Sequence, residues 1–124
     1  MSDTVATILV VDDDIFTAEL IGMLLEMGGY NVVIAEGGMD ALEKIAVDPT
    51  ISMVVSDMNM PIIDGIQLFA ELRGNGYTQP FLLLTGEDAA PLRVAYPDMD
   101  GVLTKDEDLE DVLPETVRAL LLRG

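Results

Sequence analysis

The chain has 124 residues, half of them hydrophobic, and its 23 acidic and six basic residues give a formal net charge of −17. This length predicts a single domain over 1–124. The charge argues against nucleic acid and anionic membranes as direct partners, because both carry charge of the same sign. The longest apolar runs have only four residues, whereas a bilayer span needs about 20. We therefore expect a soluble and, since no signal-peptide pattern begins the chain, cytoplasmic protein.

Two residue types, cysteine and histidine, are missing from the chain. Without cysteine it has no thiol nucleophile, disulfide or thiolate metal site. Without histidine it has no Ser-His-Asp triad, no zincin motif and no phosphohistidine of its own. Any phosphohistidine chemistry would therefore need a histidine on another protein.

Short apolar runs alternate with helical patterns along the chain. Runs rich in β-branched residues or leucine, bounded by turn residues, predict strands at 8–11, 31–35, 51–56, 81–84 and 102–104. Helical spacing and end signals predict helices at 15–27, 38–47, about 65–74, 88–96 and about 109–120. Five strand–helix units in alternation indicate an α/β fold with a doubly wound parallel sheet, covered on both faces.

Single residues set the expected helix ends. Asp14 has the position of an N-cap for the first helix, and the glycine pair at 28–29 supplies its stop. The fourth helix should be short or distorted, because Pro91 lies in its first turn and Pro97 ends it. Pro114 interrupts the last apolar pattern and should bend or split the final helix.

Polar residues follow four of the five predicted strands. Asp12 and Asp13 follow the first strand, Asp57 the third, Thr85 the fourth and Lys105 the fifth. Each alone has an ordinary explanation as a turn, cap or solvated residue. Ligands of open parallel sheets bind at the carboxyl ends of the strands, so the coincidence of all of them at one edge favours a site.

Three carboxylates at one edge need a positive partner. Two of them about 4 Å apart repel by on the order of 4 kcal/mol at an effective dielectric constant of 20. Lys105 and one divalent cation would balance the three negative charges. Because the chain has neither His nor Cys, the oxygen donors favour Mg²⁺ or Mn²⁺. A carboxylate beside such a cation can attack phosphorus and form an acyl phosphate.

In this combination the sequence resembles a response-regulator receiver domain, the phosphoacceptor module of two-component signalling, over essentially its whole length. The resemblance rests on the segments 10–14 (VVDDD) and 57–65 (DMNMPIIDG), with Thr85 and Lys105. It implies a flavodoxin-like sheet with strand order 2-1-3-4-5. It also implies a switch that assists its own phosphorylation and dephosphorylation rather than an enzyme.

The resemblance assigns roles to single residues. Asp57 is the implied phosphoacceptor, Thr85 and Lys105 bind phosphoryl oxygens, and Asn59 and Glu87 influence how long the phosphoryl group survives. The implied ligands of Mg²⁺ are Asp12, Asp13, Asp57 and the backbone carbonyl of Asn59. The phosphoryl donor is expected in trans, on a histidine kinase or a histidine phosphotransfer protein. Output is expected through contact with a downstream protein that the sequence does not identify, or by passing the phosphoryl group to a histidine elsewhere, without an attached effector domain.

The sequence departs from the family pattern in its last third. Asp106 follows Lys105 where members usually carry proline, so we expect a trans peptide bond there. Val102 replaces the usual switch aromatic, and the spacing of Tyr96 does not make it a substitute. The acceptor chemistry is thus better supported than the usual output mechanism. We expect an output surface that is rebuilt or uses the first helix.

Three other functions stay open at this point. A docking module could keep the fold without being phosphorylated, its acids being a relic or a metal site. A phosphatase of the haloacid-dehalogenase type needs Thr or Val where Phe16 stands, and a cap domain for which the chain is too short. A flavodoxin is disfavoured because the acidic edge would repel a flavin phosphate.

Overall fold

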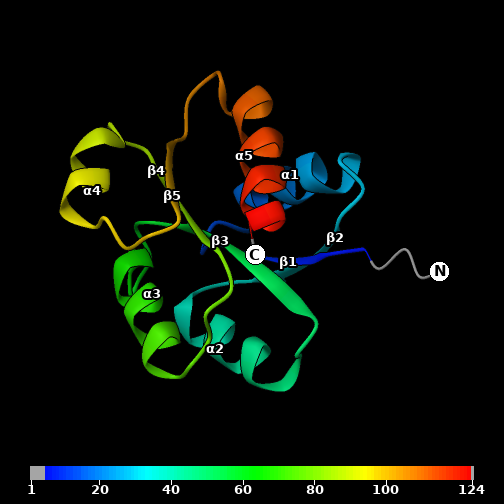
Figure 1. The fold of residues 1–124 in the computed structure, drawn as a ribbon, viewed down its shortest axis with the longest axis vertical. Coiled ribbons are helices and arrows are strands. Elements are labelled where there is room, and N and C mark those ends of the chain that lie inside the picture. The colour runs from blue at the N-terminus through cyan, green and yellow to red at the C-terminus, as the bar shows by residue number, and fades with distance from the viewer. Residues whose placement is uncertain (1–4, 124) are drawn as a thin grey trace.

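The computed structural model describes residues 5–123, which form one parallel sheet with helices on both faces (Figure 1). The strands are β1 (Thr7–Val11), β2 (Asn31–Ala35), β3 (Ile51–Asp57), β4 (Phe81–Thr85) and β5 (Gly101–Thr104). The helices are α1 (Ile15–Met27), α2 (Gly38–Val47), α3 (Gly65–Gly74), α4 (Ala90–Ala95) and α5 (Leu109–Arg123). The strand order is β2-β1-β3-β4-β5 with parallel pairing throughout, so the predicted flavodoxin-like, doubly wound fold is confirmed.

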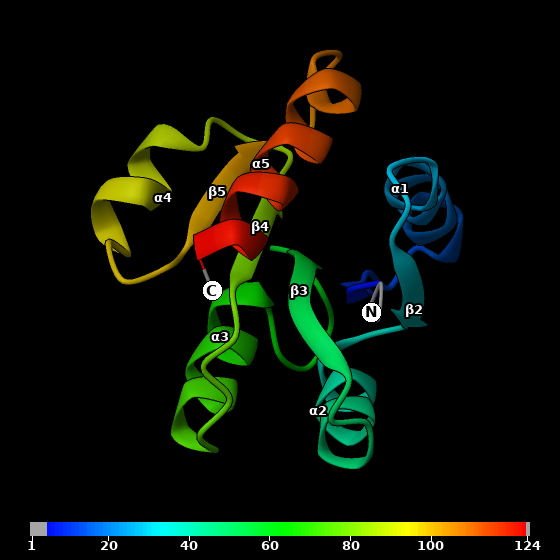
Figure 2. The ribbon, with the colours of Figure 1, turned by 45° about the vertical axis from the view of Figure 1, so that its right-hand side comes forward.

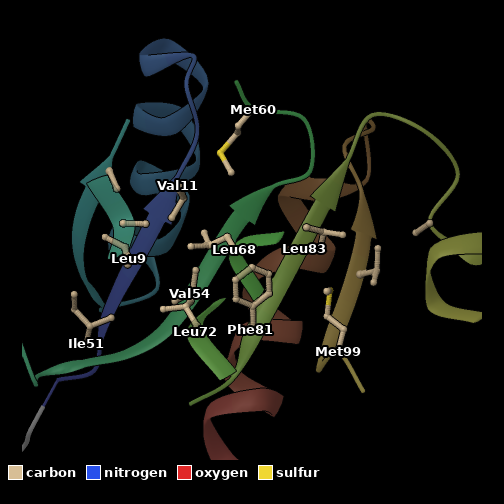
Figure 3. Close-up of a cluster of buried hydrophobic side chains, with 14 residues drawn as sticks. Leu9, Val11, Ile51, Val54, Met60, Leu68, Leu72, Phe81, Leu83 and Met99 are labelled. Atoms are coloured by element: carbon tan, nitrogen blue, oxygen red, sulfur yellow. The ribbon is translucent and has the colours of Figure 1, made fainter. Parts of the chain in front are cut away.

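Alternate residues of the inner strands supply two separate cores. Leu9 and Val11 of β1 belong to the cluster under α2, α3 and α4, with Phe81 of β4 near its centre (Figure 3). Ile8 and Val10 belong to the cluster under α1 and α5. Successive side chains of a strand point to opposite faces, which explains why runs that are apolar throughout form strands buried on both sides. The two helical layers are visible on either side of the sheet in Figure 2.

The predicted helix ends are largely confirmed. The Asp14 side chain accepts a hydrogen bond from the Phe16 N–H at 3.1 Å and caps α1, and Gly29 follows that helix with φ +94°. α3 begins with a capping box, in which Asp64 and Gln67 each accept a hydrogen bond from the other's backbone N–H. Both ends therefore follow from local side-chain chemistry.

The predictions for the last third are mixed. α4 has only six residues, with Pro91 in its first turn, so the short fourth helix is confirmed. α5 continues through Pro114 as one helix, so the expectation of a split there is wrong, and a bend at Pro114 stays a prediction. Leu113 and Val117 flank the proline and are fully buried, and this tertiary burial outweighs the lost backbone hydrogen bond.

Two further findings concern residues 5–123 as a whole. Every peptide bond within this range is trans, as expected for the bond between Lys105 and Asp106. In the same range, the helices are too short or too polar for any of them to cross a membrane.

Candidate functional site

The carboxylates of Asp12, Asp13 and Asp57 meet at the carboxyl ends of β1 and β3. These two strands are neighbours, and Val11 pairs with Ser56, so the residues that follow on each strand emerge side by side. One carboxylate oxygen from each aspartate lies within 4.8 Å of the others. The cluster predicted from sequence is therefore present in the structure.

Lys105 reaches this cluster from the end of β5. Its Nζ lies 2.7 Å from Oδ1 of Asp57 and 3.3 Å from Oδ2 of Asp12. Its backbone N–H donates to the carbonyl oxygen of Thr85 at 2.7 Å, which fixes the start of the loop after β5 against β4. One ammonium group thus bridges the two more buried carboxylates.

Asp12 is held more firmly than its neighbour Asp13. Its side chain is 3% exposed, and its Oδ1 accepts a hydrogen bond from the Asp14 backbone N–H at 2.9 Å while Oδ2 faces Lys105. Asp13 is exposed to solvent. The cluster therefore combines one fixed, buried carboxylate with one that water reaches freely.

Burial and charge perturb the ionisation of the Asp57–Lys105 pair. Burial raises the pKa of the Asp57 carboxyl and the charge of Asp12 adds to this, so together they outweigh the lowering by Lys105. Burial by itself would lower the pKa of Lys105, but hydrogen bonds and charges from Asp57 and Asp12 outweigh it, and the pKa is raised. At neutral pH the Lys105 ammonium is therefore fully charged, while the ionised form of the Asp57 carboxyl is less favourable than it is in water.

Thr85 ends β4 beside the cluster, and its side chain is buried. Asp57 pairs with Leu84 in the sheet, so Thr85 lies one residue further along the neighbouring strand. Its Oγ1 accepts a hydrogen bond from the Glu87 N–H at 3.1 Å, and among the described residues its hydroxyl makes no hydrogen bond to Asp57. A hydroxyl in this position keeps its proton available for another acceptor.

The loop between β3 and α3 is fastened close to Asp57. The Met58 N–H donates to the carbonyl of Leu84, and the Gly65 N–H donates to the carbonyl of Met58, both at 2.8 Å. A Cβ atom on Gly65 would lie 2.6 Å from the carbonyl oxygen of Asp57, so the start of α3 approaches the Asp57 backbone more closely than a side chain at this position allows. Asn59 projects from the same loop and is exposed, as is Glu87 after β4.

Sequence reasoning missed two features near the site. Ile62 has φ +75° and is 86% exposed, a conformation that β-branched residues rarely adopt and that no sequence signal marks. The hydroxyl of Thr104 accepts a hydrogen bond from the Ala89 N–H at 3.1 Å. A threonine next to Lys105 was visible in the sequence, but its partner depends on how the segment after β4 returns to β5.

Comparison with known proteins indicates the same family as the fold and the acidic cluster. The family model described as the response regulator receiver domain matches residues 8–117. The chain belongs to this family. As a receiver domain of two-component response regulators, it is neither a haloacid-dehalogenase phosphatase nor a flavodoxin.

Individual relatives agree with this assignment. The receiver domain is 42% identical over 118 residues to the response regulator MprA of Mycobacterium tuberculosis, covering 94% of this chain and 50% of that protein. The chain thus spans about half the length of this curated relative.

Two solved structures are similar over nearly their whole length. The receiver domain of the Francisella response regulator 1452 is 30% identical, with a TM-score of 0.85 and coverage of 95% of this chain and 98% of that one. TrrA of Thermotoga maritima, solved in complex with Mg²⁺ and BeF, is 30% identical, with a TM-score of 0.83 and coverage of 93% and 98%.

Proposed function

We propose that this receiver domain accepts a phosphoryl group on Asp57 from a phosphohistidine of another protein. Mg²⁺ would be held by the carboxylates of Asp12, Asp13 and Asp57 and by the backbone carbonyl of Asn59. The observation that carries the proposal is the meeting of three carboxylate oxygens within 4.8 Å of one another, with Lys105 bridging two of the aspartates. A bound Mg²⁺ would supply the positive charge that this donor set lacks and would neutralise the incoming phosphate oxygens.

The residues of the chain fit the separate needs of phosphoryl transfer. A carboxylate oxygen of Asp57 forms the bond to phosphorus as the bond between phosphorus and the donor's imidazole nitrogen breaks, and the electron pair leaves with that nitrogen. The 2.7 Å contact with Asp57 supports Lys105 as the partner of a phosphoryl oxygen on the same side chain. The free proton of the buried Thr85 hydroxyl supports it as a donor to another oxygen.

The donor and the receiver of the signal are proposed to be separate proteins. Because the chain has no histidine, the phosphoryl donor is a histidine kinase or a phosphotransfer protein in trans. Phosphorylation adds negative charge beside Thr85 and shifts the population of the segment that follows β4, which changes the contacts available to a downstream protein. In this proposal the domain acts as a switch and does not turn over a substrate.

The test is incubation with Mg²⁺ and acetyl phosphate, followed by intact-mass measurement. The wild-type chain is expected to gain the mass of one phosphoryl group, and the Asp57→Asn variant and an EDTA-treated sample are expected to gain none. The matched control is Asp64→Asn, the same substitution at the N-cap of α3, where Asn caps as well as Asp. Absence of the gain in the wild-type chain would instead favour a docking module that is not phosphorylated.

A further inference from the structure

Helix α4 lies beside β5, the edge strand of the sheet, in both ribbon views (Figure 1, Figure 2). None of its six residues is buried. Arg93 fastens it to the strand, since its Nε and one terminal nitrogen donate to the carbonyl oxygen of Val102 at 3.0 and 2.7 Å. On the outer side of an edge strand no neighbouring strand donates hydrogen bonds to the backbone carbonyls. The Arg93 guanidinium therefore supplies donors to a carbonyl that would otherwise face water.

The turn that leads into α4 is fastened at both of its ends. Thr85 and Thr104 pair across β4 and β5. The hydroxyl of Thr85 accepts from the Glu87 N–H, and that of Thr104 accepts from the Ala89 N–H, both at 3.1 Å. Only residues 86–89 separate Thr85 from α4. Because this connection is short, a displacement of Thr85 is expected to move α4 as well.

We propose that Arg93 is a positioning residue that latches α4 to β5 in the phosphoryl-free state and opposes the movement of Thr85 toward Asp57. The inference rests on the proposed phosphorylation of Asp57. A contact made in only one of two states biases the equilibrium between them, and removing it favours the other state.

The groove beside β5 offers the guanidinium a second position. Asp106 and Asp108 line this groove together with Arg93. On release from the Val102 carbonyl, the Arg93 guanidinium has these two carboxylates within the same groove as alternative partners. In this proposal the segment after β4 has a second arrangement, in which Arg93 pairs with one of these carboxylates, as a two-state switch requires.

The test compares Arg93→Met, which keeps the side-chain length but removes the donors, with Arg118→Met on α5. Arg118 lines a different groove, with Tyr30 and Pro114. Hydrogen exchange of Mg²⁺-free protein is expected to become about tenfold faster in α4 for Arg93→Met, the loss of about one charged hydrogen bond. Arg118→Met should leave exchange in α4 unchanged.

The second measurement is calorimetric titration with beryllium fluoride in the presence of Mg²⁺, with beryllium fluoride as a phosphoryl analogue. Arg93→Met is expected to bind it about five- to tenfold more tightly than the wild type, because the latch no longer opposes the bound state. A merely structural role would leave the affinity unchanged or weaken it. Unchanged exchange in α4, or an affinity that does not rise, would overturn the latch while leaving the phosphoacceptor function standing. A wild type that does not bind beryllium fluoride would overturn both.

Discussion

Gly65 is the point at which the scaffold touches the proposed phosphoacceptor, and adding one methyl group there has a calculable effect. In Gly65→Ala the new Cβ would lie 2.4 Å from Cδ1 of Leu83 and 2.6 Å from the carbonyl oxygen of Asp57, where ordinary contact begins at 3.4 Å. The Asp57 carbonyl must therefore move by about 0.8 Å, the difference between 3.4 and 2.6 Å, unless α3 shifts away. Overpacking of this kind costs about 1–3 kcal/mol. The helix preference of Ala over Gly returns up to about 1 kcal/mol.

The matched control is Gly74→Ala at the other end of the same helix, where a Cβ meets nothing within 4 Å. That variant should gain up to about 1 kcal/mol, so the two substitutions should differ by about 2 kcal/mol in unfolding free energy. For a chain of this size each kcal/mol moves the melting temperature by about 3–5 °C, which calorimetry resolves easily. Gly65→Ala should also slow acetyl-phosphate-dependent phosphorylation, whereas Gly74→Ala should not. Equal melting temperatures for the two variants would refute the close approach on which the reasoning depends.

Three further predictions concern the same edge of the sheet. The Ile62→Gly variant should melt at a higher temperature than the Ile62→Ala variant, because only glycine removes the strain of about 1–2 kcal/mol at φ +75°. Thermal unfolding of both variants checks this, and equal melting temperatures would count against a strained loop. Since the pKa of Asp57 is raised from its ordinary value of 3.8, ionisation of this group destabilises the metal-free fold. Asp57→Asn should therefore become the more stable protein as pH rises from about 3.8 through the folded-state pKa, and denaturant titrations in EDTA that show no such gap would contradict the assignment. Asn59→Ala and Glu87→Ala should each change the lifetime of the phosphorylated chain, measured by loss of the phosphoryl mass. Two unchanged lifetimes would show that these exposed side chains do not influence how long the phosphoryl group survives.

The main features of the fold could be predicted because the signals that set them are local. The strand at 31–35 and the helices at 15–27 and 38–47 have the predicted ends, since apolar period, caps and glycine stops all lie within the segments concerned. The aspartate cluster was also predictable, because adjacent parallel strands present their carboxyl ends at one edge. The strand order that makes β1 and β3 neighbours was implied by the resemblance to receiver domains and not by these local signals.

The remaining features depend on contacts between segments distant in the sequence. Whether Pro114 breaks α5 is decided by how deeply Leu113 and Val117 are buried against the sheet, which the local pattern does not contain. The bridging of two carboxylates by Lys105 depends on how the loop after β5 leaves the sheet. The contact of Arg93 with the Val102 carbonyl requires the position of α4 relative to the edge strand, and its sequence spacing gives no sign of it.

The central claim is that Asp57, and no other carboxylate of the acidic edge, receives the phosphoryl group. The direct test is borohydride reduction after incubation with Mg²⁺ and acetyl phosphate, since borohydride converts an aspartyl phosphate to homoserine. Tandem mass spectrometry of the digested chain should then find homoserine at position 57 alone, and only in samples that contained Mg²⁺. Homoserine at position 12 or 13, or none at any position, would contradict the account.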